Sequence, residues 1–152
     1  MDCNINKKDK FADQFDGSIS LREALVMRRE YRDEWKVGGL FTNVPHVVTD
    51  HSPTGFEFGY GGSGPADLAL NVCQVYLNMQ GYRGRKTKCW DGECWSLAWT
   101  LHQDFKREVI ASVPREGAII PFSVIEDWFG LNMTDELVDQ CRAFEDEVDD
   151  VL

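Results

Sequence analysis

A chain of 152 residues suits a single domain and is long enough to bury a core without help from metals or disulfides. Hydrophobic residues make up 43% of it and aromatic residues 12%, which argues against a disordered chain. The net charge of −10 disfavours direct binding to nucleic-acid phosphates, except through a local basic patch.

The sequence shows no run of about eighteen apolar residues, and its start, MDCNINKKDKF, lacks the apolar centre of a signal peptide. We therefore expect a soluble protein of the cytoplasm with no membrane partner. The five cysteines are an odd number without a secretion signal, so we expect reduced thiols without metal. We expect no cofactor.

The first half of the chain predicts an arm, a helix and a hairpin. Residues 1–17 are expected to form a flexible arm, and residues 18–152 one α+β domain. A capping-box pattern begins at Ser20, and the apolar spacing that follows predicts a helix over 21–36 that ends at Gly38 and Gly39. Strands at 47–50 and 56–60 are predicted to pair as a hairpin across the turn at 51–55.

The domain is expected to be built around a buried helix over 65–80. Nearly every face of that stretch is apolar, which is typical of a helix inside a core. Its polar residues fall on one narrow stripe: Asp67, Asn71, Gln74 and Asn78. Pro65 suits the first turn, and Gly81 suits the C-terminal cap.

The second half predicts further helices at 93–113, 122–129 and 134–149 and a short strand at 118–120. Two interpretations remain for residues 89–95. Asp91-Gly92 is either a hairpin turn that pairs Cys89 with Cys94 across two strands, or Asp91 caps the helix that follows. Helical periodicity favours the second interpretation. The fold class is thus α+β, with a small antiparallel sheet of two to four short strands against about five helices.

A glycine-rich loop precedes the buried helix. Residues 59–64 match the dinucleotide pattern G-x-G-x-x-G, but no continuous apolar strand flanks the match and no acidic residue follows at the expected distance. A weaker prediction is an anion or phosphorylated ligand at the helix start. Its candidate residues are His51, Tyr60, Gly61, Gly62, Ser63 and Gly64. The alternative is that Gly61 and Gly64 adopt backbone angles closed to other residues and allow close packing.

Other candidates for chemistry are sparse. Cys89 and Cys94 with His102 suggest zinc, but the spacing differs from the usual C-x2-C pattern and no fourth ligand is evident. His46, His51 and His102 are candidates for acid–base work, and no identifiable nucleophile accompanies them. We therefore expect a binding protein rather than an enzyme.

Charge is concentrated at the C-terminus. Residues 134–152 hold eight acidic residues against Arg142, a net charge of −7. Five of them are the predicted partner-binding residues: Glu145, Asp146, Glu147, Asp149 and Asp150. A basic patch lies at Arg83, Arg85, Lys86 and Lys88. A solvated helix face and an exposed loop are the plainer interpretations of the two clusters.

The stretch HSPTGFEFGYGGSGPADLAL at 51–70 resembles the hallmark of a family of small bacterial and phage proteins, catalogued as domain of unknown function 6166. Members typically show H-S-P-x-G-F-E-W-G-Y-G-G-S-G-P-A-x-L-A-L. Residues 104–109 and 125–128 resemble the family's F-K-x-E-F-V and I-x-x-W-L blocks, so the resemblance covers roughly 47–130. Phe58 replaces the usual tryptophan, and the insert at 81–95 is longer and more basic than expected.

The resemblance implies a phage-encoded origin and no known activity. Small acidic phage proteins often disable a host system, so the first hypothesis is an inhibitor of a host defence or nucleic-acid-handling component. Its acidic terminal helix would contact a basic surface on a host protein in the host cytoplasm. The alternatives are a ligand-binding or catalytic module acting on a phosphorylated small molecule at the glycine loop, and an accessory phage protein with no inhibitory role.

Overall fold

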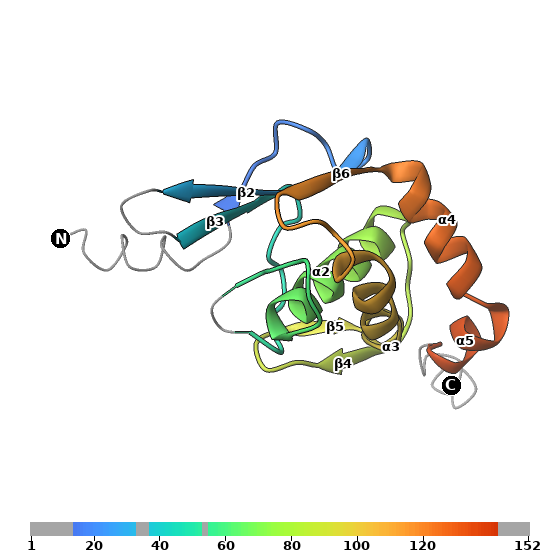
Figure 1. The fold of residues 1–152 in the computed structure, drawn as a ribbon. Coiled ribbons are helices and arrows are strands. Elements are labelled where there is room, and N and C mark those ends of the chain that lie inside the picture. The colour runs from blue at the N-terminus through green and yellow to red at the C-terminus, as the bar shows by residue number, and fades with distance from the viewer. Residues whose placement is uncertain (1–13, 33–36, 53–54, 143–152) are drawn as a thin grey trace, which may run out of the picture.

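The computed structural model describes residues 14–32, 37–52 and 55–142, and its larger sheet is organised around strand β2 (Ala24–Arg32) (Figure 1). Strand β3 (Val37–Thr42) and strand β6 (Gly117–Pro121) pair with β2 on either side, both antiparallel. The short strand β1 (Gln14–Phe15) pairs with β3 in parallel, which gives the order β1-β3-β2-β6.

Strand β2 replaces the helix predicted over 21–36. Leu25 and Met27 enter the core on one face of the strand, while Ala24 and Val26 are also buried on the other. Because both faces are apolar, the sequence lacks the alternation that marks a half-buried strand. Ser20 begins a turn here, since its carbonyl accepts from the backbone N–H of residues 23 and 24. Pairing with β3 and β6 then decides the conformation.

Helix α2 (Ser63–Met79) lies at the centre of the domain, as predicted. Its apolar side chains are at most a few per cent exposed along most of its length. Gly81 ends it with a left-handed φ of 70°, and the backbone N–H of Tyr82 donates to the Leu77 carbonyl. Figure 1 shows α2 beneath the β2–β3–β6 part of the sheet.

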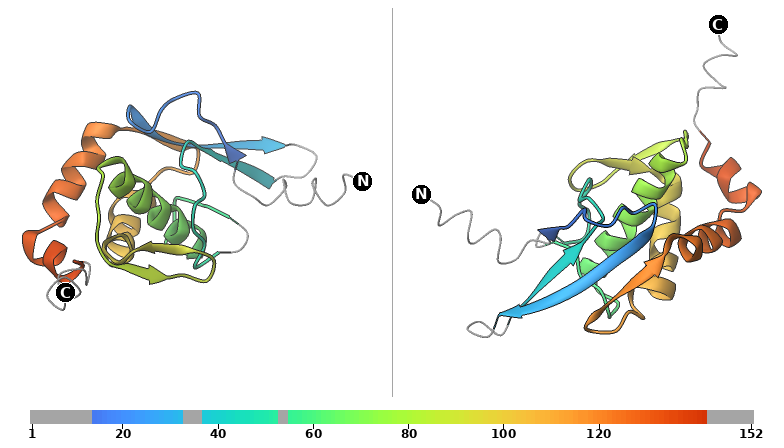
Figure 2. Two further views of the ribbon diagram at one scale, coloured as in Figure 1. Left: turned by 180° about the vertical axis from the view of Figure 1, so that it is seen from behind. Right: turned by 90° about the horizontal axis from the view of Figure 1, so that it is seen from above.

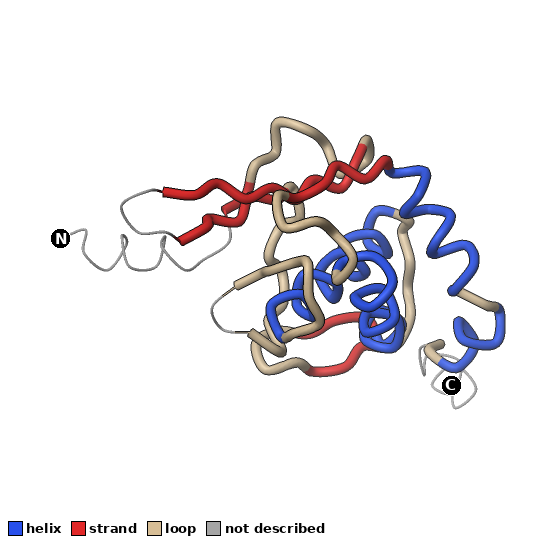
Figure 3. Tube along the Cα trace, viewed as in Figure 1, coloured by secondary structure: helices blue, strands red, loops and turns tan. Residues whose placement is uncertain are grey.

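The described residues between β3 and α2, 43–52 and 55–62, form an extended loop instead of the predicted hairpin (Figure 3). Thr49 makes an isolated bridge to Asp91, and Gly59 donates its backbone N–H to the Ile110 carbonyl. The prediction of strands at 47–50 and 56–60 was wrong. For the first of them the reason is that Asn71 and Asp67 of α2 bind much of its backbone.

Of the two interpretations of residues 89–95, the hairpin is correct, and the favoured one, in which Asp91 caps the following helix, is wrong, because Trp95 is the N-cap of that helix. Strands β4 (Lys86–Lys88) and β5 (Glu93–Trp95) form a hairpin, and Gly92 occupies its turn with a φ of 105°. Helix α3 (Ser96–Phe105) begins directly after β5, three residues later than predicted, and continues into the π-helical turn η1 (Lys106–Ile110). The hairpin lies on the side of α2 away from the larger sheet (Figures 1 and 2).

Helix α4 (Phe122–Asn132) follows β6 and closes one end of the core. Its Phe129 stacks on Tyr76 of α2 with ring centroids 4.0 Å apart, and its Trp128 meets Phe105 of α3 edge to face at 4.9 Å. Helix α5 (Asp135–Gln140) begins at the Thr134 cap and ends at Gln140, whereas the sequence predicted a helix to 149. Residues 143–149 lie outside the described part of the chain.

These elements confirm the predicted α+β class, with a small sheet packed against helices around a buried central helix. Of the predicted arm at 1–17, residues 14 and 15 form β1, and residues 1–13 lie outside the described residues. No helix in the described part of the chain has the length and apolar character needed to span a membrane.

Candidate functional site

Asp67 ties the loop before α2 to the helix itself, and it is completely buried. One oxygen, Oδ1, accepts from the backbone N–H groups of Asp50 and His51 at 3.1 and 3.0 Å. The other, Oδ2, accepts from the backbone N–H of Ser52 at 2.8 Å. Several N–H donors compensate the buried carboxylate, so the loop at 50–52 has a fixed position relative to α2.

Two further residues of the polar stripe on α2, Asn71 and Gln74, bind backbone in the same way. Asn71 accepts from the N–H groups of Val47 and Val48 at 2.7 and 3.0 Å and donates to the Val48 carbonyl at 2.8 Å. Gln74 accepts from the N–H of Trp95 at 2.8 Å. These buried side chains replace the partners that a sheet would provide, which explains why a helix inside the core carries polar residues.

The loop fixed by Asp67 brings His51 against His102 of α3. Their Nε2 atoms lie 2.9 Å apart, and His102 is 1% exposed. The Nδ1 of His102 lies 2.5 Å from the Trp99 carbonyl, which can only accept, so this nitrogen carries the proton. In the neutral ring Nε2 is therefore an acceptor, and His51 donates to it.

Burial lowers the pKa of His102, and the nearby His51 acts in the same direction. The hydrogen bond to the Trp99 carbonyl and the carboxylates of Asp50 and Asp67 oppose that lowering. The carboxylate of Asp50 lies beside the pair, with Oδ2 3.6 Å from the His51 Nε2. A proton taken up by the two imidazoles would therefore lie beside a negative charge.

We call Asp50, His51, Asp67, Trp99 and His102 the histidine site. It reaches solvent through His51, whose side chain is 22% exposed, and through the Trp99 ring stacked on it at 5.7 Å. The backbone N–H of exposed Trp90 donates to Asp50 Oδ1 at 2.9 Å. The arrangement can accept, hold and release one proton near a molecule resting on these rings.

The glycine loop is a separate part of the surface. Tyr60 is about half exposed, and the pKa of its phenol is raised by burial first and by Glu57 second. Glu57 makes a two-pronged ion pair with Arg29 of β2 at 2.7 and 3.1 Å, and that guanidinium lies 4.5 Å from the Phe58 ring centroid. The loop is thereby fastened to the sheet.

The conformational argument for Gly61 and Gly64 was wrong, because neither has a positive φ; in this loop Gly59 does, at 87°. Gly64 is required for a different reason. A Cβ at this position would lie 2.7 Å from the Cβ of Glu57, whereas a Cβ on Gly61 would have nothing within 4 Å. Close packing therefore explains Gly64.

The structure distributes the predicted residues over different places. The His51 ring contacts His102 and Trp99, while Tyr60 lies near Glu57. The ligand-binding role predicted for His51 and the glycine loop stays a prediction. The predicted partner-binding residues Glu145, Asp146, Glu147, Asp149 and Asp150 all lie outside the described residues.

Cys89 and Cys94 meet across the hairpin with their Sγ atoms 3.2 Å apart. Within the described ranges, no group of three or more His, Cys, Asp or Glu side chains has a geometry that could hold a metal ion. The suggestion of zinc at these cysteines and His102 therefore finds no support there.

Sequence reasoning considered His51 and His102 one at a time and missed their pairing. It also assigned no role beside these histidines to Asp50, Asp67 or Trp99. Asp67 offered the available signal, since a carboxylate inside an otherwise apolar helix requires buried donors. The identity of those donors depends on how the loop folds back, which local periodicity does not encode.

Comparison with known families gives a match over part of the chain. A family model described as "Family of unknown function (DUF6166)" matches residues 27–88, so the chain is similar to that family from β2 to β4. This agrees with the family identified from the sequence, but the matched segment begins earlier and ends earlier than the resemblance at 47–130. No curated protein and no solved structure matches the chain.

Proposed function

We propose that the protein is a phage-type binding protein that modulates its host by protein–protein contact in the host cytoplasm. Its partner would be a host component of defence or nucleic-acid handling, as for an anti-CRISPR or anti-restriction protein. The recognised feature of that partner would be a basic surface. The observation that carries the proposal is the exposure of the acidic residues at the start of the C-terminal segment.

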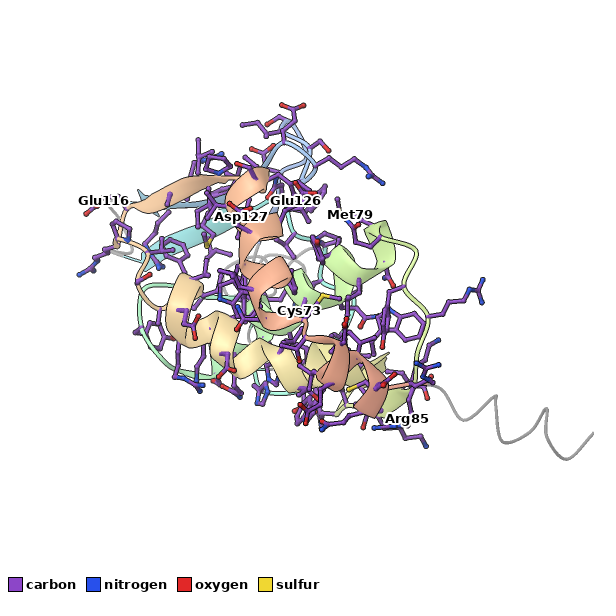
Figure 4. The ribbon with its side chains drawn as sticks, turned by 90° about the vertical axis from the view of Figure 1, so that its right-hand side faces the viewer. Cys73, Met79, Arg85, Glu116, Glu126 and Asp127 are labelled. Carbon is purple, nitrogen blue, oxygen red and sulfur yellow. The ribbon has the colours of Figure 1, made fainter. Side chains whose placement is uncertain are left out.

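The described part of that segment presents its charge to solvent. No side chain of α5 is buried, and Asp135, Glu136 and Asp139 are all exposed. Glu126 and Asp127 on α4 are exposed as well, and Figure 4 shows both on the outer side of that helix. The acidic character therefore extends from 134–152 onto the neighbouring helix, with Arg142 beside Asp139 as a local counter-charge.

Helix α5 is also held in place at its C-terminal end. The backbone N–H of Arg85 donates to the Cys141 carbonyl at 2.9 Å, and the Arg85 Nη1 donates to the Gln140 carbonyl at 2.9 Å. The Tyr82 hydroxyl lies 3.4 Å from the same Cys141 carbonyl. Arg85, counted from sequence in a basic patch, thus caps α5, and Figure 4 shows it beside that helix. This anchor gives the acidic segment a fixed starting point.

A concentration of carboxylates suits a basic groove that normally receives phosphates. Opposite charges steer the encounter and are screened by salt, so capture should be fast and should weaken as salt rises. Concentrating like charges on one terminal element costs stability through mutual repulsion. Scattered charges would keep the protein soluble equally well, so solubility alone does not explain why the acidic residues are concentrated in one segment.

The test begins with capture of the partner from bacterial lysate at low salt and its identification by mass spectrometry. Its affinity is then measured for a variant in which Glu145, Asp146, Glu147, Asp149 and Asp150 become Gln or Asn. Amides keep the shape and remove only the charge. We expect an unchanged melting temperature and capture at least about tenfold weaker at low salt, a loss of about 1.4 kcal/mol.

A matched control removes the same number of charges elsewhere, at Asp9, Glu23, Asp91, Glu93 and Glu116. We expect the affinity of the control variant for the partner to be within about twofold of the wild-type affinity when both are measured at the same salt concentration. If both variants weakened binding equally, the loss of affinity would be explained by the net charge of the protein and not by the acidic segment. Unchanged binding by the terminal variant would rule out recognition through the acidic segment.

A ligand-binding or catalytic module at the glycine loop is the second candidate. The N-cap of α2 is Gly62, with no side-chain cap, and no acidic residue lies in the first turn to offset the positive end of the helix dipole. A thermal-shift screen of mono-, di- and cyclic nucleotides tests it. A true ligand at a hundred times its dissociation constant should stabilise the protein by about 2.7 kcal/mol. If none shifts the melting temperature, this candidate is set aside.

A further inference from the structure

Two thiols face each other on the β4–β5 hairpin. In the hairpin register Thr87 lies opposite Cys94, so Cys89, two residues after Thr87, stands on the same face as Cys94 and diagonal to it. The Sγ atoms are 3.2 Å apart. Both cysteines are free thiols in the structure. A small movement of either side chain would therefore bring the two sulfurs close enough to form a disulfide bond.

The two thiols differ in access to solvent. Cys94 is 0% exposed, whereas Cys89 is partly exposed beside the turn. A third thiol, Cys73 of α2, is also 0% exposed, and its pKa is raised first by burial and second by the nearby Cys94. A reagent from solvent therefore meets Cys89 first, and Cys94 is the partner placed to react with it next.

We propose that Cys89 and Cys94 form a reversible dithiol–disulfide site that exchanges with low-molecular-weight disulfides. Cys89 is the entry thiol and Cys94 the resolving thiol. The site is independent of partner binding by the acidic segment. It is also compatible with reduced thiols in a reducing compartment, because the disulfide forms only when small disulfides accumulate.

The exchange proceeds in two balanced steps. The Cys89 thiolate attacks one sulfur of the small disulfide, the old S–S bond breaks, and one thiolate leaves while a mixed disulfide forms on Cys89. Cys94 then loses its proton and its thiolate attacks the Cys89 Sγ. The mixed disulfide breaks, and that proton neutralises the second departing thiolate. The two protein thiols are oxidised by two electrons, and one small disulfide is reduced to two thiols.

The surroundings control the rate of this exchange. Burial raises the pKa of the Cys89 thiol, and Asp50 and Asp67 add to that rise, while its contact with Cys94 opposes it. Because only the thiolate attacks, exchange should be slow near neutral pH and should accelerate as pH rises. The ring closed by the disulfide spans 89–94, with exposed Trp90 at its tip.

Oxidised glutathione is the probe for the test. The full chain, carrying Cys3→Ser to remove a thiol outside the described residues, is treated with excess probe, alkylated and digested with a glutamyl endopeptidase. Cleavage after Glu93 separates Cys89 from Cys94. We expect two peptides joined by a disulfide, at least about tenfold protection of Cys89 from alkylation, and full recovery of both thiols with dithiothreitol.

Single variants identify the role of each thiol. Cys94→Ser should retain a stable glutathione adduct on Cys89, because the resolving sulfur is missing. Cys89→Ser should leave Cys94 at least about tenfold slower to form an adduct, because Cys94 is buried. Cys73→Ser is the matched control, and it should still form the 89–94 disulfide. Melting curves establish that each variant is folded.

If a serine variant does not fold, the wild-type time course still decides the matter, since the Cys89 adduct should rise and then fall as the internal disulfide appears. A stable glutathione adduct on wild-type Cys89 would overturn the proposal. So would two unmodified thiols after treatment that fully modifies the unfolded chain.

Discussion

The Nε2 atoms of His51 and His102 lie 2.9 Å apart, although α2 and the β4–β5 hairpin separate the two residues along the chain. The contact needs one proton between the two nitrogens. Two fully protonated rings would turn N–H toward N–H and repel, so the contact is incompatible with both rings charged. The pairing therefore couples the geometry of the loop at 50–52 to pH.

Acid should destabilise the protein through His102. Burial lowers its pKa below the ordinary 6.5, so as pH falls below that value the unfolded state takes up a proton before the folded state does. The contribution of this histidine to stability is complete above pH 6.5. It is lost as pH falls through the lowered value of the folded state. Urea unfolding between about pH 8 and pH 5 measures the resulting slope.

His102→Asn should flatten that slope, because asparagine does not titrate and can still donate to the Trp99 carbonyl. We expect a cost of about 1–3 kcal/mol at pH 8 from lost packing. His46→Asn, at an exposed imidazole, is the control and should leave the slope nearly unchanged. A wild-type slope that persists in His102→Asn would assign the acid sensitivity to another group.

Sequence reasoning recovered the centre of the fold because the information there is local. An apolar stretch with Pro65 near its start and Gly81 at its end defines α2 without reference to the rest of the chain. Strand β2 was missed for the opposite reason. Its partner β6 begins at Gly117, and the residues that bury Ala24 and Leu25 come from distant segments. A short run that is apolar on both faces fits a helix or a strand equally well.

The histidine site could not be predicted from the sequence for a similar reason. Its assembly depends on Asp67 holding the loop and on α3 presenting His102, and these contacts span 16 and 51 positions of sequence. The glycine loop shows a different limit. Its pattern correctly indicated tight packing, but only the structure shows that Gly64 is restricted by Glu57 while Gly61 is open.

Asp67→Asn should be strongly destabilising. The amide keeps one oxygen but turns two N–H donors toward a position where Asp50, His51 and Ser52 already supply donors. Loss of a charged acceptor and a buried donor clash together suggest about 2–4 kcal/mol. Chemical unfolding measures the cost. Asp127→Asn on the exposed face of α4 removes the same charge and should change stability by less than about 0.5 kcal/mol.

The Asp67 variant also tests the link to the histidine site. If Asp67 positions the loop, tryptophan emission should change in Asp67→Asn, because Trp99 stacks on His51. Wild-type emission with a stability loss under about 0.5 kcal/mol would show that the loop holds its place without the carboxylate.

Gly64→Val and Gly61→Val separate packing from conformation in the glycine loop. A side chain at Gly64 collides with the Cβ of Glu57 and should cost more than about 2 kcal/mol. A side chain at Gly61 meets open space and should cost less than about 0.5 kcal/mol. Thermal melts compare the two. Equal costs would mean that the close approach to Glu57 is relieved by a small backbone shift.

Arg85 should control the local stability of α5. Its backbone and guanidinium bind the Gln140 and Cys141 carbonyls, which are among those that a helix leaves without partners at its C-terminus. Arg85→Ala should therefore cost about 1 kcal/mol of local stability and speed amide exchange in α5 several-fold, while exchange in α2 stays unchanged. Arg83→Ala removes the same charge from an exposed neighbour and should leave amide exchange in α5 within about twofold of the wild-type rate.

Arg85→Lys separates charge from geometry, because lysine keeps the cation but lacks the planar fork. Exchange in Arg85→Lys close to that of Arg85→Ala would assign the anchor to the guanidinium. If α5 exchanges at the wild-type rate in Arg85→Ala, the helix is held by the backbone hydrogen bond at residue 85 and by its contacts with the core.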